Sequence, residues 1–353
     1  MADRSLIVVN YRSAALCRGA VQSARDASSE PLEIVIVDNS CDPREAAALE
    51  SIGADRLIVA GSNLGYAGGA NAGIAASSGS VAVVSNPDIV FAAGCVDRLA
   101  EVLGGRVALS GPRFSWDAGG AWLLPPAEVT TLRGEVSRRL ASRSAVRAMR
   151  RSRRRFLDRV AFWRAASPLR VAAVSGALMA VERNAWRRVG KFDERYRLYY
   201  EEIDFMRALG REGLELRHVP AARCRHIYDQ SAASEAEHRD KFAESEMLYL
   251  EKWHGPGVRL LRLLESGDGV FTDAAVALPP SGAIGVPSRP EDYVVEASPL
   301  ESFDTAAGHF PERGEVRVPA EIWESFHGSA LFVRVVEAAT GREVSRGVLR
   351  KSA

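Results

Sequence analysis

Three carboxylates stand within four residues of the chain, at Glu201, Glu202 and Asp204, between aromatic and apolar neighbours. Crowding of like charges beside apolar groups raises the pKa of a carboxyl, which suits a general base working near neutral pH. Acidic side chains are also common in the first turn of a helix, where they interact favourably with the helix dipole. The segment therefore predicts either a catalytic base or a solvated helix start.

Asn86, Pro87 and Asp88 form a second candidate motif, directly after an apolar run. Mg²⁺ and Mn²⁺ prefer oxygen ligands and are commonly held by one or two carboxylates together with phosphate oxygens. His226 follows later in the chain, and an imidazole nitrogen could complete the coordination of such a cation. Alternatively, Asn-Pro-Asp only forms a turn and the histidine is structural.

Short apolar runs alternate with helix-compatible stretches over the first 110 residues. The runs cover residues 6–9, 34–37, 57–59 and 81–84, and the helical stretches cover 13–27, which Ser13 would cap, and 43–52. This alternation predicts a parallel sheet with helices on both faces, in which ligands bind beyond the carboxyl ends of the strands. Polar or glycine-rich residues follow each run, at Asn10, Asp38, 61–73 and 85–88. We therefore expect a nucleotide site along one edge of the sheet.

The domain organisation follows from changes in composition along the chain. We expect a catalytic domain over residues 1–265, with an inserted arginine-rich stretch at about 133–164. Residues 266–290 include a segment rich in Pro, Gly and Ser, which is typical of a linker. Residues 291–353 show short alternating segments and predict a small β-rich domain.

The inserted stretch, residues 133–164, holds twelve arginines against two acidic residues. Four apolar residues recur near one face at helical spacing: Met149, Phe156, Val160 and Trp163. A basic amphipathic helix of this kind can lie on an anionic membrane. It can equally be a solvated insertion whose apolar stripe packs on the catalytic domain. Nucleic acid is disfavoured as a partner, since no recognised binding motif accompanies the charge.

The overall composition is that of a globular protein, with 47% hydrophobic and 26% charged residues and a net charge of +1. Four scattered cysteines without C-x-x-C spacing indicate reduced thiols rather than a disulfide framework. No window approaches a membrane-spanning length, and the first residues lead straight into a predicted strand. We therefore expect a cytoplasmic protein.

The motifs occur in one order along the chain, and as an ordered set they resemble the family-2 inverting glycosyltransferases. The set comprises Val8–Ser13, Val37–Ser40, Asn63–Gly73, Asn86–Asp88, Ser175–Ala177 and Phe192–Asp204. Within that family the sequence resembles the rhamnosyltransferase-like branch, and the resemblance covers about residues 5–255. It implies a GT-A fold, a Rossmann-like, mostly parallel sheet flanked by helices, with a nucleotide-binding half and an acceptor-binding half.

The resemblance also implies roles for individual residues. Glu202 stands where the family's catalytic base usually lies, with Glu201 beside it, and Asp88 and His226 correspond to metal-binding positions. Asp38 would bind the pyrimidine ring. The nucleotide sugar would contact Asn10, Tyr11, Asp38, Asn63, Gly65, Asn71 and Asn86, and the acceptor and donor sugar would contact Ser175, Gly176, Ala177 and Asp204.

Three positions depart from the family pattern. Asn86 replaces an aspartate that many members have, Glu202 replaces a more usual aspartate, and Lys191 replaces a common glycine. The first departure predicts weaker metal binding without donor, and the second moves the base one methylene further out. Neither changes the predicted class.

The sequence thus predicts a metal-dependent inverting transferase with Mn²⁺ or Mg²⁺ as cofactor. We expect L-rhamnose from dTDP-rhamnose as the sugar, and a glycan or lipid-linked acceptor in cell-surface polysaccharide synthesis. A dinucleotide-dependent oxidoreductase would need G-x-G-x-x-G after the first strand, where this chain has residues 10–13 as Asn-Tyr-Arg-Ser. A non-catalytic sugar-nucleotide or glycan-binding protein on the same fold stays an alternative function. A homodimer and peripheral contact with the inner face of the membrane are compatible with either function.

Overall fold

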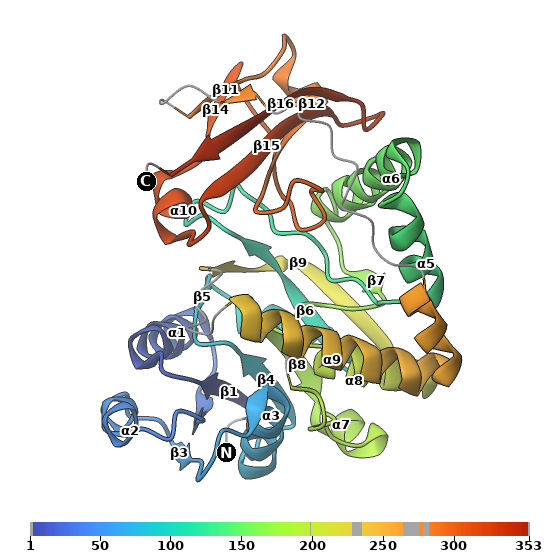
Figure 1. The fold of residues 1–353 in the computed structure, drawn as a ribbon. Helices are drawn as coiled ribbons and strands as arrows, with labels where there is room; N and C mark the ends of the chain where they lie inside the picture. The colour runs from blue at the N-terminus through green and yellow to red at the C-terminus, as the bar shows by residue number, and fades with distance from the viewer. Residues whose placement is uncertain (1–2, 198, 228–234, 264–275, 278–281, 352–353) are drawn as a thin grey trace.

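A nine-stranded sheet forms the centre of the larger part of the molecule (Figure 1). The computed structural model describes residues 3–197, 199–227, 235–263, 276–277 and 282–351. The strand order is β3-β2-β1-β4-β8-β6-β9-β5, and β7 pairs with β9. The strands are β1 (Arg4–Asn10), β2 (Leu32–Asp38), β3 (Arg56–Val59), β4 (Val81–Ser85), β5 (Ile89–Phe91), β6 (Val107–Ser115), β7 (Leu169–Val171), β8 (Leu178–Glu182) and β9 (Glu215–His226).

Strands β3, β2, β1 and β4 are parallel, as the alternation of apolar runs and helices predicted. Strand β8 then runs antiparallel between β4 and β6. Helices α1 (Ala14–Ala27), α2 (Pro43–Glu50) and α4 (Cys95–Glu101) pack on one face of the sheet. Helices α3 (Gly65–Ala76), α7 (Arg183–Val189) and α8 (Glu201–Arg211) pack on the other. Because helices cover both faces of the sheet, a ligand can bind at the edge formed by the carboxyl ends of the parallel strands.

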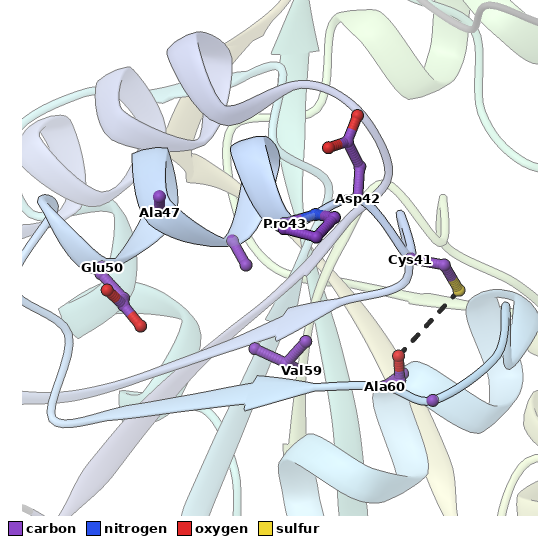
Figure 2. A pocket seen from close by; sticks show the side chains of 9 residues that line it. Cys41, Asp42, Pro43, Ala47, Glu50, Val59 and Ala60 are labelled. Carbon is purple, nitrogen blue, oxygen red and sulfur yellow. Dashed lines mark hydrogen bonds between the residues drawn. The ribbon is translucent and has the colours of Figure 1, made fainter.

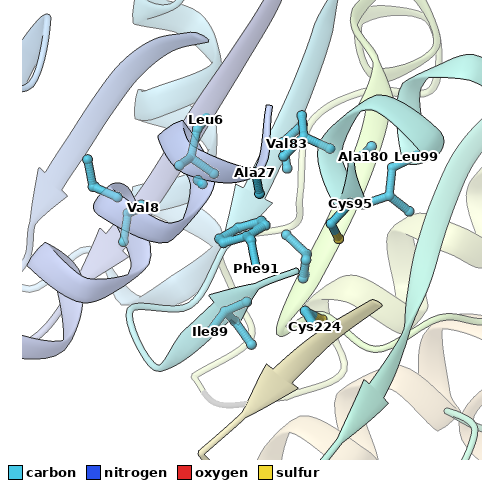
Figure 3. Packing of buried hydrophobic residues seen from close by; sticks show 14 of the residues in the cluster. Leu6, Val8, Ala27, Val83, Ile89, Phe91, Cys95, Leu99, Ala180 and Cys224 are labelled. Carbon is cyan, nitrogen blue, oxygen red and sulfur yellow. The ribbon is translucent and has the colours of Figure 1, made fainter. Parts of the chain in front are cut away.

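Strand β1 is buried on both sides, because successive side chains enter different cores. Leu6 and Val8 pack in the core under α1 and α4, part of which Figure 3 shows. Ile7 and Val9 pack in the core under α3. A Cβ at Gly73 of α3 would lie 2.3 Å from Ile7 Cγ2, so a glycine is needed for this close helix–strand approach.

The C-terminal part is a small β-rich unit, as predicted. Its five-stranded sheet has the order β10-β16-β15-β12-β13, and β11 pairs with β14. The elements are β10 (Val276–Ala277), β11 (Ala283–Gly285), η2 (Pro290–Asp292), β12 (Tyr293–Ser298), β13 (Ala307–His309), β14 (Glu315–Arg317), α10 (Ala320–Ser325), β15 (Ala330–Glu337) and β16 (Glu343–Arg350). Strands β10 and β11 fall within the predicted linker and pair with strands of this unit. Helix α9 (Glu235–His254) and η1 (Pro256–Leu263) precede it.

The arginine-rich stretch forms two helices, α5 (Leu132–Ala141) and α6 (Ala145–Trp163). Phe156, Val160 and Trp163 of its apolar stripe are buried, and they pack with residues of the C-terminal sheet. Figure 1 shows α6 beside that sheet. These three side chains therefore cannot face a membrane. The stripe therefore packs on protein, as the second alternative predicted. The surface on which it packs belongs largely to the C-terminal unit and not to the catalytic domain. Met149, by contrast, is 65% exposed.

A buried charge cluster joins α6 to the C-terminal sheet. Glu296 of β12 is fully buried, and its Oε1 accepts hydrogen bonds from Arg159 Nε at 2.9 Å and Nη2 at 2.6 Å. Its other oxygen, Oε2, accepts one from Arg334 Nε at 2.7 Å. Removing one member of a buried pair leaves the partner charges uncompensated. Glu296 is therefore the centre of the contact between the two parts.

We expect Glu296→Gln to lower the free energy of unfolding by about 3–5 kcal/mol, since two buried arginines lose their counter-ion. Chemical denaturation monitored by circular dichroism measures this change. Glu315→Gln is the matched control, because Glu315 pairs with Arg317 at an exposed position where an ion pair contributes at most about 1 kcal/mol. Equal stability of the two variants would contradict a structural role for the cluster.

Among the helices of the described residues, none is long and apolar enough to cross a bilayer.

Candidate active site

Strands β1 and β2 bring two predicted nucleotide residues together at the edge of the sheet, because Asn10 and Asp38 are register partners. Asp38 Oδ1 accepts a hydrogen bond from the Ser40 backbone N–H at 2.9 Å. Its Oδ2 is buried and has no hydrogen-bond partner among the described residues. A buried carboxylate oxygen without a donor is costly, so this atom is suited to accept an N–H from a ligand. Tyr11, which follows Asn10, is 44% exposed beside it.

Other residues that are predicted to bind the nucleotide form hydrogen bonds within the protein around the site. Asn10 donates from Nδ2 to Glu45 Oε1 at 2.9 Å, and Ser13, whose hydroxyl makes no cap bond to α1, donates to Asn10 Oδ1. Asn63 Oδ1 accepts from the N–H of Gly65, whose φ of +70° allows the sharp turn into α3. These bonds set the shape of the nucleotide edge. Direct contact of Asn10, Asn63 and Gly65 with a nucleotide stays a prediction.

Asn71 connects α3 to the segment before α8. Its Nδ2 donates to Phe192 O at 2.9 Å and to Glu194 Oε1 at 2.8 Å, and its Oδ1 accepts from Phe192 N at 3.0 Å. The amide is 4% exposed. Its geometry favours a structural role over a ligand contact.

The predicted metal residues lie side by side. Asp88 follows β4, and Ile89 pairs with His226 across β5 and β9. This pairing places His226 Nε2 3.2 Å from Asp88 Oδ2, with both side chains largely buried. A carboxylate and an imidazole suit Mn²⁺, and the carboxylate suits Mg²⁺. Within the part of the chain that the structure describes, no group of three or more His, Cys, Asp or Glu side chains is placed to hold a metal ion.

Asn86 precedes this pair in the turn after β4. Its backbone N–H donates to the carbonyl of Ala177 at 2.8 Å, and its own carbonyl accepts from the Ser85 hydroxyl. These bonds join the metal motif to the loop of residues 175–177. A role for the Asn86 side chain in metal or nucleotide binding stays a prediction.

Glu201 and Glu202 begin α8 after two residues in the left-handed backbone region. Tyr199 has φ of +61° and Tyr200 has φ of +72°, a strained conformation for bulky residues. Such strain clusters at functional sites, where the surrounding structure holds it. A Cβ at Gly176 would lie 3.0 Å from Glu202 Cγ, so the absence of a side chain there makes room for this glutamate.

Burial raises the pKa of both glutamates, and for Glu201 the neighbouring charge of Glu202 raises it further. Each has a buried Oε2 that accepts no hydrogen bond within the described part of the chain. Tyr66 lies close by and donates from its hydroxyl to Gly176 O at 2.5 Å. The pKa of Tyr66 is also raised, by burial and then by Glu202 and Glu201. These are the electrostatic features of a general base. The alternative of a solvated helix start is correct in position, because α8 begins at Glu201, but Glu201 is buried and not solvated.

Asp204, one turn further along α8, has several partners. Its Oδ1 accepts from Trp253 Nε1 at 2.7 Å and from the Tyr196 hydroxyl at 3.1 Å, while its Oδ2 accepts from Lys252 Nζ at 2.8 Å. It is 4% exposed. The carboxylate holds α9 against α8, so its geometry favours structure over a contact with sugar.

Two hollows lie near these residues. A pocket of about 410 Å³ opens at the carboxyl ends of β2 and β3, between Cys41, the start of α2 and Ala60 (Figure 2). A smaller one of about 170 Å³ is lined by Ser175 and His226 together with aromatic and proline side chains. Tyr66 and this second pocket were not predicted from the sequence. Tyr66 carried a signal, since it stands within the ordered motif of residues 63–73.

Part of the chain matches a known protein family. The family described as "Glycosyl transferase family 2" matches residues 5–162. The chain is 26% identical over 269 residues to the N-acetylglucosaminyl-diphospho-decaprenol L-rhamnosyltransferase of Mycobacterium tuberculosis, in strains CDC 1551 / Oshkosh and ATCC 25618 / H37Rv. That alignment covers 70% of this chain and 84% of the relative.

Two solved structures resemble the fold more distantly. One is the mannosyltransferase PcManGT from Pyrobaculum calidifontis in complex with GDP-Man and Mn²⁺, with a TM-score of 0.47, 16% identity and coverage of 71% of this chain and 64% of that one. The other is GalNAc-T7 with UDP, GalNAc and Mn²⁺, with a TM-score of 0.48, 15% identity and coverage of 75% and 54%. The chain thus has a mixed α/β sheet, matches glycosyltransferase family 2 over residues 5–162, and is similar over most of its length to a rhamnosyltransferase.

Proposed function

We propose that this protein is an inverting, metal-dependent glycosyltransferase that moves L-rhamnose from dTDP-rhamnose to a lipid-linked or glycan acceptor. The observation that supports it most is the pairing of Asp88 with His226 at the sheet edge, joined through Asn86 and Ala177 to the loop that packs against Glu202. The M. tuberculosis relative is named for rhamnosyl transfer to a lipid-linked acceptor, which supports the sugar and the acceptor class.

In the proposed mechanism each group has a separate task. Asp38 accepts the ring N–H of the pyrimidine, and Asp88 and His226 would hold the cation. A divalent cation bound there supplies neutralisation of the charge on the departing diphosphate. Glu202 takes the proton of the acceptor hydroxyl as this oxygen attacks the anomeric carbon from the opposite face. One displacement inverts the configuration, so no second carboxylate is needed as a nucleophile.

Base recognition tests the proposal directly. We expect dTDP and UDP to bind better than GDP and ADP, and Asp38→Asn to weaken dTDP binding about 10- to 100-fold. The asparagine can keep the bond from Ser40 N, but it then presents an N–H to the pyrimidine N–H, and a hydrogen bond to a charged group contributes about 1.5–3 kcal/mol. Isothermal calorimetry with Mn²⁺ measures both effects.

Asp55→Asn is the matched control, since Asp55 also accepts one backbone N–H, from Ile34, at the opposite end of β2. Equal affinity for all four nucleotides would contradict the role of Asp38. Binding of dTDP-rhamnose without turnover on any acceptor would favour a sugar-nucleotide-binding protein instead.

Membrane contact is proposed through the uncovered part of α6. Val146 and Met149 are 53% and 65% exposed, and Arg147, Arg150 and Arg154 are exposed near them. The replacements Arg147→Gln, Arg150→Gln and Arg154→Gln together should weaken sedimentation with phosphatidylserine-containing liposomes, because each basic residue near an anionic surface contributes about 1 kcal/mol. Activity on a short soluble acceptor should not change. Absence of liposome binding by the parent protein would rule this contact out.

A further inference from the structure

The 170 Å³ pocket borders the candidate active site on one side. Ser175 and His226 line it there. His226 belongs to the proposed metal pair, and Ser175 precedes Gly176, against which Glu202 packs. The pocket therefore lies next to both the proposed base and the proposed cation. An acceptor hydroxyl has to reach this region to be deprotonated and to attack the donor sugar.

The opposite side of the pocket belongs to the C-terminal unit, through Pro299 and Thr305. Pro299 directly follows β12, and Thr305 lies just before β13 with its side chain exposed. This wall is held firmly in place. Leu123 and Gly308 exchange two backbone hydrogen bonds of 2.8 Å, and Arg155 Nε lies 3.1 Å from Asp304 Oδ1.

A second contact fixes the C-terminal unit to the strand that carries His226. Glu321 of α10 accepts from the backbone N–H of Ala118 at 2.8 Å, and its other carboxyl oxygen lies 3.5 Å from Arg225 Nη2. Arg225 also donates from Nε to Trp116 O at 3.2 Å. The pocket is thus preformed at the junction between the larger part of the molecule and the C-terminal unit. Domain interfaces of this kind are a common location for small-molecule sites.

The lining indicates what the pocket can hold. Phe114 and Trp116 supply aromatic surface, Pro125 and Pro126 add apolar surface, and Thr305 places a hydroxyl at the rim. The apolar face of a sugar ring packs on such surfaces, while its hydroxyls bond to hydroxyl groups at the edge. A volume of about 170 Å³ is below the range of about 300–1,000 Å³ that is usual for drug-sized ligands, which suits one ring rather than a long chain.

We propose that the C-terminal unit completes the acceptor subsite, and that this pocket holds one sugar ring of the acceptor, with Pro299 and Thr305 as specificity-determining contacts. The inference rests on the proposed transferase function, because an acceptor subsite needs a donor site beside it. It assigns a role to a part of the chain that lies beyond the family-2 match at residues 5–162.

The test replaces Thr305 with Trp in the full chain to fill the mouth of the pocket. The assay uses dTDP-rhamnose, Mn²⁺ and a panel of octyl glycosides that includes octyl N-acetylglucosaminide. We expect the acceptor KM to rise at least tenfold. The donor KM and the slow release of dTDP without acceptor should not change. Thr340→Trp is the matched control, because Thr340 is also an exposed threonine of the C-terminal unit but does not line the pocket.

Each outcome separates this inference from the proposed function. Absence of dTDP release by the parent protein would contradict the transferase function itself. Intact release with an unchanged acceptor KM in Thr305→Trp would overturn the acceptor subsite alone. A donor KM that rises as much as the acceptor KM would assign the pocket to the donor, and transfer to no glycoside in the panel would exclude a sugar ring there.

Discussion

Glu202→Gln is expected to lower kcat about 10²- to 10⁴-fold, the usual cost of losing a positioned general base. Glutamine keeps the size of the side chain and its packing against Gly176, but it cannot take a proton at neutral pH. Dissociation of dTDP should change little, because Asp38 and its neighbours lie at the ends of β1 and β2 on another part of the sheet. Single-turnover kinetics with saturating donor measures the loss.

The pH profile gives a second, independent measure of the same base. Burial raises the pKa of Glu202, and only the carboxylate form can accept a proton. Activity of the parent protein should therefore fall as the pH drops through a value above that of a free glutamate, which is about 4.3. This acidic limb should disappear from the residual activity of Glu202→Gln.

Glu201→Gln is the internal control, since both glutamates are buried, adjacent and raised in pKa. An inactive Glu201 variant beside an active Glu202 variant would reverse the assignment. If both variants turn over at the parental rate while still binding donor, neither is the base. Asp193 is then a weak substitute, because salt bridges to Arg195 and Lys252 keep its pKa low.

The parallel half of the sheet could be predicted from the sequence because its cause is local. The runs at residues 6–9, 34–37 and 81–84 are apolar throughout, as strands buried on both faces must be, whereas the run at 57–59 forms the partly exposed edge strand β3. The arginine-rich helix shows where such local reasoning ends. Its amphipathic pattern predicted a helix correctly, but the same pattern fits a lipid surface and a protein surface. Only the tertiary structure shows that Phe156 and Trp163 contact the C-terminal unit.

The candidate site was predictable for a different reason. The family resemblance assigned Asp88 and His226 to one predicted metal site, although 137 intervening residues hide the β5–β9 pairing that joins them. Polarity alone could not separate ligand-facing from structural side chains. Asn71 and Asp204 both belong to the motifs, yet their hydrogen bonds are used within the protein. The pocket at the junction combines residues from both parts of the chain, which no local pattern records.

Asp88→Ala is expected to reduce kcat/KM about 10³-fold, and excess chelator should abolish turnover of the parent protein. A catalytic cation typically supplies several kcal/mol of charge stabilisation, and each 1.36 kcal/mol is a factor of ten in rate. His226→Ala removes the other half of the 3.2 Å pair and should weaken Mn²⁺ binding without displacing Asp88 from its turn. Asp26→Ala, at an exposed aspartate of α1, is the matched control.

Direct measurement of the metal separates binding from catalysis. Electron paramagnetic resonance should show weak Mn²⁺ binding to the parent protein alone and tight binding with dTDP, since Asp88 and His226 supply two ligands and phosphate oxygens would add to the coordination. Asn86→Asp adds a carboxylate beside Asp88 and should tighten binding in the absence of dTDP. Full turnover in excess chelator, or identical Mn²⁺ affinity in Asp88→Ala and the parent, would remove the cation from the mechanism.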